Sequence, residues 1–320
     1  MSMTDNDLKP EEFGQAAAEA IADAQPREFR DAAQVLANAG LCGVCAAEEA
    51  GGLGLGIEFA LPIVAEAGRL RLQWPLLETI LIAKALGDSP RAARLASGEC
   101  VATMALQGSL QEKFAGHARH AAQSDWVLVA DGQGGGALLD LRTVELQSDE
   151  AMDPDFPQAW LTLDKAEVLA TLDAPAYAAL QRDSQILIAG LVNGAAEGAL
   201  LTTAEYMSTR VQFGRPLSAK QAVRHLLARM RLVQEASNAG VQRLLSKDEY
   251  GRTRATGPVL ANALGNAAFV LEKSIHLHGG MGFTWEVPLH YALREVRKFD
   301  AAFGAGALAR QSGRDFIESV

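Results

Sequence analysis

The sequence predicts a mainly α-helical protein with a small β domain in its middle. Alanine-rich stretches over residues 8–97, and again from about residue 173 onward, carry apolar residues at three- and four-residue spacings, which is the helical period. Between them, short apolar runs broken by glycine and proline are typical of strands. We therefore expect three domains: an N-terminal helical domain (residues 1–98), a small β domain (99–165) and a C-terminal helical bundle (166–320).

The composition argues against several classes of partner. The chain has 320 residues, of which 49% are hydrophobic, and this is enough for a large buried core. Its formal net charge of -10 argues against non-specific nucleic-acid binding and against a polybasic membrane anchor. The sequence has no visible secretory signal and no apolar run near the roughly 20 residues of a membrane span. We expect a cytoplasmic protein that binds neither nucleic acid nor membrane.

Two patterns in the N-terminal domain look like binding motifs. The segment Gly51-Gly52-Leu53-Gly54-Leu55-Gly56 lacks the βαβ setting of a dinucleotide loop and the Gly-Lys-Ser/Thr of a P-loop, so a turn between helices is the better interpretation. Cys42 and Cys45 have a redox or half-zinc spacing, but no second pair completes a zinc site. We interpret them as buried thiols and expect no metal. The odd count of three cysteines fits a reducing compartment.

Particular segments are predicted as helices or strands. Apolar periodicity predicts helices over Glu12–Ala24 and Phe59–Leu70. A flexible turn at Gly134–Gly136 separates two of the apolar runs in the β domain. The strands are expected within these runs: Val101–Leu106, Asp125–Ala130, Ala137–Leu141 and Trp160–Leu163.

The C-terminal domain shows two helical patterns. Gly190, Gly194 and Gly198 share one helix face, which predicts that the backbone of a second helix approaches closely there. The following helix, over about residues 221–246, carries an apolar stripe that we interpret as bundle core. The stripe consists of Val223, Leu226, Leu227, Met230 and Val233.

Two stretches are more specific than these patterns. The first, Arg210 to Gln221, reads Arg-Val-Gln-Phe-Gly-Arg-Pro-Leu-Ser-Ala-Lys-Gln, and the second, His276 to Pro288, contains His-Gly-Gly-Met-Gly-Phe. In order and separation they resemble the acyl-CoA dehydrogenase family, whose motifs read Arg-x-x-Phe-Gly, with a Gln beyond, and His-Gly-Gly-x-Gly-Phe. Glu48–Leu55 is a weaker match to that family's N-terminal domain. The resemblance is strong from Arg182 onward and poor over residues 99–165.

The resemblance implies a fold, a cofactor and a reaction. The fold would have an N-terminal helical domain, a reduced β-barrel middle domain and a C-terminal four-helix bundle. The reaction would be the FAD-dependent α,β-desaturation of an acyl-CoA thioester, in lipid or steroid catabolism, with electrons passed to an electron-accepting flavoprotein. The assembly would be a dimer or tetramer, either of one chain or with a related longer subunit.

The chemistry of FAD binding accounts for the residue types in the two motifs. An arginine guanidinium can bond two phosphate oxygens, and glycine lets backbone amides approach a pyrophosphate closely. Phe213 would give an apolar wall. Taken alone, Arg210 could be a surface salt bridge, and Gly279-Gly280 could be a helix-capping turn. The resemblance assigns these residues to FAD: Arg210, Gln212, Phe213, Leu217, Gln221, His276, Gly279 and Gly280. His276 stands where the family often has Gln.

The catalytic base is not evident. A glutamate removes the α-proton in this family, and the two places at which members carry it fall on Ser184 and Phe303, which cannot act as bases. Asp183 and Asp300 are weak candidates. The alternatives are that Asp183 is an acidic residue in the first turn of a helix and that Asp300 pairs with Arg297.

This combination favours one subunit of a mixed-subunit dehydrogenase, in which a partner supplies the base and the missing part of the β domain. Three alternatives remain open at this point. The chain could be an autonomous dehydrogenase that uses Asp183, a non-catalytic scaffold subunit without flavin, or an acyl-CoA oxidase.

Overall fold

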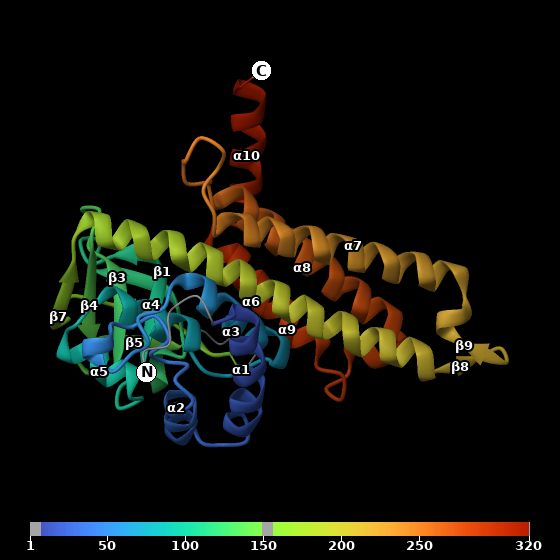
Figure 1. The fold of residues 1–320 in the computed structure, drawn as a ribbon, viewed down its shortest axis with the longest axis horizontal. Coiled ribbons are helices and arrows are strands. Elements are labelled where there is room, and N and C mark those ends of the chain that lie inside the picture. Colours follow the sequence, from blue (N-terminus) through green and yellow to red (C-terminus); the bar gives the residue numbers. More distant parts are fainter. Residues whose placement is uncertain (1–7, 149–155, 320) are drawn as a thin grey trace. The chain divides into compact units, whose positions relative to one another are not determined.

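The computed structural model describes residues 8–148 and 156–319. The chain divides into two compact units. Unit 1 comprises the residues up to 67 and residues 72–187, and unit 2 comprises residues 68–71 and 188 onward. The long helix α6 (Ala174–Thr209) contributes to both units, because the boundary falls within it (Figure 1). The division into three domains at residues 98 and 165 stays a prediction.

Unit 1 begins with helices, as the sequence predicts. Pro10 opens the first helix, where its fixed φ is favourable, and Glu11 and Glu12 place negative charge against the positive end of the helix dipole. Ser89 caps the fifth helix, because its hydroxyl accepts the Ala92 N–H at 3.2 Å. The helices are α1 (Pro10–Ala24), α2 (Phe29–Asn38), α3 (Ile57–Leu70), α4 (Leu76–Ala85) and α5 (Pro90–Ala96).

The two motif-like patterns of unit 1 are structural. The Gly51–Gly56 segment is a turn between helices, in which the Leu53 N–H donates to the Gly43 carbonyl at 3.0 Å. Cys42 and Cys45 are buried free thiols, and burial raises the pKa of each to about 12, so both stay protonated. Both interpretations are confirmed. Over residues 8–148 and 156–319, no group of three or more His, Cys, Asp or Glu side chains is placed to hold a metal ion.

A seven-stranded mixed sheet follows the helices of unit 1. Its strand order is β5-β6-β2-β1-β3-β4-β7, and β1 and β3 run parallel while all other neighbours are antiparallel. Buried Val127, Val129 and Leu139 lie in its core. The strands are β1 (Ala102–Ser109), β2 (Phe114–Arg119), β3 (Trp126–Ala130), β4 (Gly136–Asp140), β5 (Glu145–Ser148), β6 (Gln158–Thr162) and β7 (Val168–Leu172).

The four predicted strands of this sheet are confirmed, and its other three strands were missed. Strand β2 has few β-branched residues, and β5 is polar and largely exposed, so neither gives an apolar signal. Strand β7 begins at Val168, beyond the expected limit of the β domain at residue 165. It is an edge strand whose residues are mostly exposed or half-buried. Pairing with β4 stabilises it, and its own sequence gives little signal for a strand.

Unit 2 is helical. A Cβ on Gly198 would lie 2.6 Å from the Arg69 carbonyl oxygen, so the predicted close approach of a second helix backbone is confirmed at this glycine. In the predicted apolar stripe Met230 is fully buried and the other four residues are half-buried. Its elements after α6 are strands β8 (Val211–Gln212) and β9 (Arg215–Pro216), and helices α7 (Gln221–Leu244), α8 (Gly257–His278), α9 (Leu289–Ala302) and α10 (Ala307–Glu318).

Helix α6 is long and apolar enough to cross a membrane by length and composition. This is weak support for a membrane span, because 78% of its most apolar window is buried inside the protein, as in a core helix.

Candidate functional site

The first motif forms a tight hairpin at the end of α6. Strands β8 and β9 pair antiparallel, and the two residues that join them, Phe213 and Gly214, both have positive φ, of 56° and 77°. This geometry suits a two-residue hairpin, and glycine adopts it without cost. For phenylalanine the left-handed conformation costs roughly 1–2 kcal/mol. The hairpin therefore holds Phe213 in a conformation that its side chain disfavours.

Phe213 is also strongly exposed. Its side chain is 89% accessible, and its only described ring contact is with the Lys220 ammonium, 4.8 Å from the ring centroid. A large apolar side chain gains nothing from exposure to water. A strained and exposed phenylalanine is consistent with a surface that another molecule covers.

The hairpin lies in a basic stretch of an acidic protein. Residues 206–234 contain six Arg and Lys residues and no Asp or Glu, although the whole chain has a net charge of -10. Arg231 pairs with Glu197 and Glu235. Arg210 is exposed and forms no ion pair with any residue that the structure describes, so the interpretation of Arg210 as a surface salt bridge is not supported. The six cations are Arg210, Arg215, Lys220, Arg224, Arg229 and Arg231.

The second motif ends helix α8. Gly279 has φ 60° and ψ -137°, a conformation that is almost restricted to glycine, and its N–H donates to the His276 carbonyl. Gly279 is therefore a capping residue, as the simpler interpretation expected. However, a Cβ on Gly279 or Gly280 would meet no atom within 4 Å. The turn faces open space, and its backbone is accessible to a ligand.

The two motifs converge in unit 2 through a pair of aromatic rings. Tyr206 in α6 and His278 in α8 are stacked, with ring centroids 4.4 Å apart and an angle of 12° between the planes. Tyr206 lies one helical turn before Arg210, and His278 directly precedes Gly279. Tyr206 was not among the site residues expected from the sequence. The available signal was its spacing of four residues before Arg210, which follows the end of α6 and donates its N–H to the Tyr206 carbonyl.

A shallow cavity of about 310 Å³ lies beside this stacked pair. Its acidic residues are Glu205 and Glu286, and hydrogen bonding from Thr284 lowers the pKa of the Glu286 carboxyl. The cavity is lined by Thr202, Glu205, Tyr206, Thr209, His278, Glu286, Val287 and Pro288.

Most residues assigned to FAD from sequence are accessible. Only Leu217, at the start of a short 3₁₀ helix before α7, is half-buried. Gln221 is the first residue of α7 and does not line the cavity between α6 and α8. The exposed residues are Arg210, Gln212, Phe213, Gln221, His276, Gly279 and Gly280.

Asp183, one candidate base, is held in an ion pair in unit 1. Its Oδ2 lies 2.5 Å from Nζ of Lys84, and its side chain is only 14% exposed. It is the tenth residue of α6, so its interpretation as a first-turn residue is wrong: the helix begins earlier, at Ala174. The hydroxyl of the neighbouring Ser184 donates to the Gln181 carbonyl at 2.7 Å. Both side chains are thus engaged by groups of the chain itself.

Asp300, the other candidate base, stabilises a turn. Its Oδ1 accepts the Gly306 N–H at 2.9 Å, in the connection between α9 and α10. The alternative interpretation, a pair with Arg297, is wrong, because that guanidinium lies 2.6 Å from Oε1 of Glu272. Arg297 therefore pairs with Glu272 on α8 and not with Asp300, which lies three positions further along α9.

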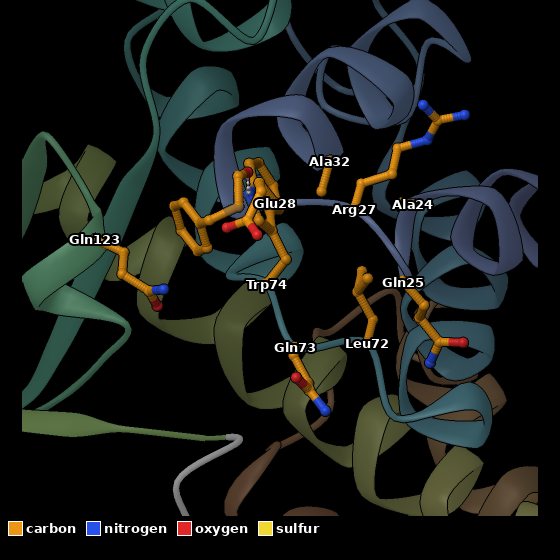
Figure 2. Close-up of a pocket in the computed structure, with 10 residues that line it drawn as sticks. Ala24, Gln25, Arg27, Glu28, Ala32, Leu72, Gln73, Trp74 and Gln123 are labelled. Atoms are coloured by element: carbon orange, nitrogen blue, oxygen red, sulfur yellow. Dashed lines mark hydrogen bonds between the residues drawn. The ribbon is translucent and has the colours of Figure 1, made fainter.

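A second cavity, of about 190 Å³, lies in unit 1 between the α1–α2 turn and the segment before α4 (Figure 2). One of its walls is Trp74, whose Nε1 donates to the Phe29 carbonyl at 3.2 Å. The cavity contains no residue of either motif and is smaller than most ligand pockets. It is lined by Ala24, Gln25, Arg27, Glu28, Phe29, Ala32, Leu72, Gln73, Trp74 and Gln123.

Comparison with known proteins agrees with the two motifs. Residues 182–314 match the model of the C-terminal domain of acyl-CoA dehydrogenases. The chain is similar to acyl-CoA dehydrogenase FadE34 of Mycobacterium tuberculosis, with 31% identity over 294 residues that cover 87% of this chain and 40% of FadE34. It is similar to acyl-CoA dehydrogenase IpdE2 of the same organism, with 29% identity over 248 residues that cover 76% of this chain and 72% of IpdE2.

The fold agrees as well. The structure of the ChsE4-ChsE5 complex from Mycobacterium tuberculosis is similar, with a TM-score of 0.81 and 20% identity, over 99% of this chain and 98% of the compared chain. The mainly α fold with a β middle region is thus confirmed. The chain spans less than half the length of FadE34. Residues 182–314 therefore belong to the acyl-CoA dehydrogenase C-terminal domain family, and the chain as a whole has the fold found in that similar structure.

Proposed function

We propose that this chain is an FAD-binding subunit of an acyl-CoA dehydrogenase, which desaturates an acyl-CoA thioester between its α and β carbons. The observation that carries the proposal is the Arg210 hairpin. It combines an exposed guanidinium, which has no ion pair among the described residues, with a strained, exposed Phe213, at the same end of unit 2 as the open Gly279 turn. FAD, when bound, supplies the hydride acceptor. The electrons would then pass to an electron-accepting flavoprotein.

The described residues fit FAD. Arg210 and the amides of the Gly279-Gly280 turn suit a pyrophosphate, because the first offers a charged fork and the second an unobstructed backbone. Phe213 offers an exposed ring for apolar contact, and the Gln221 amide can bond adenine or ribose. The carboxylates of Glu205 and Glu286 suit hydroxyl or amino donors rather than phosphate. Leu217, Gln212 and His276 are secondary contacts in this proposal.

The catalytic base is proposed to come from a partner chain. The places expected for the glutamate are occupied by Ser184 and Phe303, and Asp183 is engaged by Lys84. A similar fold is found in a structure described as a ChsE4-ChsE5 complex, which names two components. We therefore favour a dimer or tetramer that includes a related longer subunit. A single monomeric species with FAD bound, seen by sedimentation at micromolar concentration, would contradict this.

A cytoplasmic location is part of the same proposal. It is supported by three free cysteines, all buried, which suit a reducing compartment. Cell fractionation followed by immunodetection tests it, and recovery of the chain in a secreted or membrane fraction would contradict it.

The test of the proposed function is a flavin count after co-expression with the product of a neighbouring reading frame. We expect a yellow assembly with FAD bound non-covalently. Arg210→Ala should weaken FAD binding by about 1.5–3 kcal/mol, or roughly 10- to 150-fold, since a phosphate loses a charge-assisted bond. Arg243→Ala is the matched control, because Arg243 is an exposed arginine in the last turn of α7.

Three outcomes would overturn or change the proposal. A colourless assembly that takes up no FAD with any partner would favour a scaffold subunit. Equal FAD affinity in Arg210→Ala and Arg243→Ala would remove the hairpin from the cofactor site. Rapid reduction of oxygen by the loaded assembly would redefine the activity as that of an oxidase.

A further inference from the structure

The stacked pair of Tyr206 and His278 links two elements that are far apart in the sequence. Tyr206 precedes the hairpin, and its carbonyl accepts the Arg210 N–H at 2.9 Å. His278 is the last residue of α8, directly before the Gly279 turn. The centroid distance of 4.4 Å and the 12° angle describe nearly parallel rings in contact. Any shift of one helix end relative to the other would disturb this contact.

The His278 ring is itself fixed. Its Nδ1 lies 2.8 Å from the Ser274 carbonyl oxygen, which can only accept, so Nδ1 carries the hydrogen. The side chain is buried, with 5% of the residue exposed. A hydrogen bond to its own helix therefore sets the plane of the imidazole. Tyr206 stacks against a surface that α8 holds in one orientation.

We propose that Tyr206 and His278 are positioning residues for the cofactor site: their stacking holds the Arg210 hairpin and the Gly279-Gly280 turn at one separation, so that both can engage the same ligand. The inference rests on the proposed FAD function, since it assumes that both elements bind one molecule. Tyr206 lies outside both motifs, and the proposal requires no contact between either ring and the ligand.

The first experiment measures FAD affinity of the co-expressed assembly in stacking variants. Tyr206→Phe keeps the ring and should change the dissociation constant by less than about twofold. Tyr206→Leu and His278→Leu should each weaken binding by about three- to tenfold, the contribution of one aromatic pair. The Tyr206→Leu/His278→Leu double variant should bind FAD as tightly as the single variant with the lower affinity, because the two residues act through one contact.

A control separates this effect from a general loss of packing. Phe13→Leu removes one ring of another aromatic pair, with Phe59 in unit 1, whose centroids are 5.2 Å apart. It should lower the melting temperature of the FAD-free protein about as much as Tyr206→Leu and leave FAD affinity unchanged. Equal FAD affinity in Tyr206→Leu and Tyr206→Phe, or additive losses in the double variant, would overturn the inference.

A second readout does not depend on FAD. The three native thiols are buried, so spin labels can be attached selectively at Val211→Cys and Met281→Cys, which replace residues that are 55% and 46% exposed. With labelled chains diluted by unlabelled ones, the distance distribution between the labels should be narrow in wild type and Tyr206→Phe and broader in Tyr206→Leu. An unchanged width would also overturn the inference.

The two proposals fail in different ways. If Arg210→Ala leaves FAD affinity unchanged, the proposed function fails, whatever the label distances show. If Arg210→Ala weakens FAD binding but Tyr206→Leu does not, only the positioning role fails.

Discussion

The part of helix α6 in unit 1 and the end of α6 in unit 2 differ in whether their polar side chains have partners within the chain. In unit 1, Asp183 is paired with Lys84, and Ser184 donates to a carbonyl of its own helix. In unit 2, Arg210 follows the last turn without an ion pair among the described residues, and Phe213 is exposed in a strained turn. The first part is complete within the chain. The second carries exposed groups that have no ion pair among the described residues, and we propose this region as the cofactor site.

The largest effect expected from this comparison concerns turnover. The isolated chain should oxidise acyl-CoA thioesters about 10²- to 10⁴-fold more slowly than its complex with a base-bearing partner, because that is the usual cost of losing a general base. A dye-reduction assay over a panel of acyl-CoA thioesters measures the difference.

Asp183→Asn is the control for this prediction. If the Lys84 pair is structural, the substitution should lower the free energy of unfolding by up to about 1 kcal/mol and leave the activity of the complex almost unchanged. Robust turnover by the isolated chain, abolished in Asp183→Asn while FAD binding persists, would break the comparison and identify Asp183 as the base.

A smaller effect is expected at the Gly279 turn. Gly279→Ala should lower the free energy of unfolding by roughly 1–3 kcal/mol, because alanine does not readily adopt φ 60° with ψ -137°. Chemical denaturation measures the change. Gly265→Ala in the same helix is the matched control: its Cβ would also meet no atom within 4 Å, but its backbone is helical, so about 0.5–1 kcal/mol of stabilisation is expected. Changes of the same sign in both variants would contradict the prediction.

The smallest effect sharpens the comparison most. Phe213→Asn should stabilise the FAD-free protein by about 0.5–1 kcal/mol, because Asn-Gly suits this hairpin turn better than Phe-Gly, and should weaken FAD retention at the same time. Thermal unfolding and flavin release measure the two quantities. Phe316→Asn, at another exposed phenylalanine in α10, should give no gain in stability. Stabilisation without loss of FAD would mean that the strain at Phe213 serves no binding role.

Local patterns in the sequence identified most of the secondary structure. The apolar period over Phe59–Leu70 gave a helix, and the apolar run at Asp125–Ala130 gave a buried strand, because both signals lie within the segment itself. Strands β2 and β5 were missed, since their stability comes from pairing with distant strands. The motif residues could likewise be identified from the sequence, because the motifs are defined by spacing along the chain.

The sequence by itself determined most of the helical segments, the apolar strands, the family resemblance and the residues of the two motifs. Only the tertiary structure decided which side chains have an ion-pair or ring-stacking partner within the chain. The pairing of Lys84 with Asp183, 99 positions apart, and the stacking of Tyr206 on His278 are contacts between distant segments. Such contacts depend on how helices pack, and no local period or spacing encodes them, because a side chain's partner is set by the approach of another segment and not by its own neighbours along the chain.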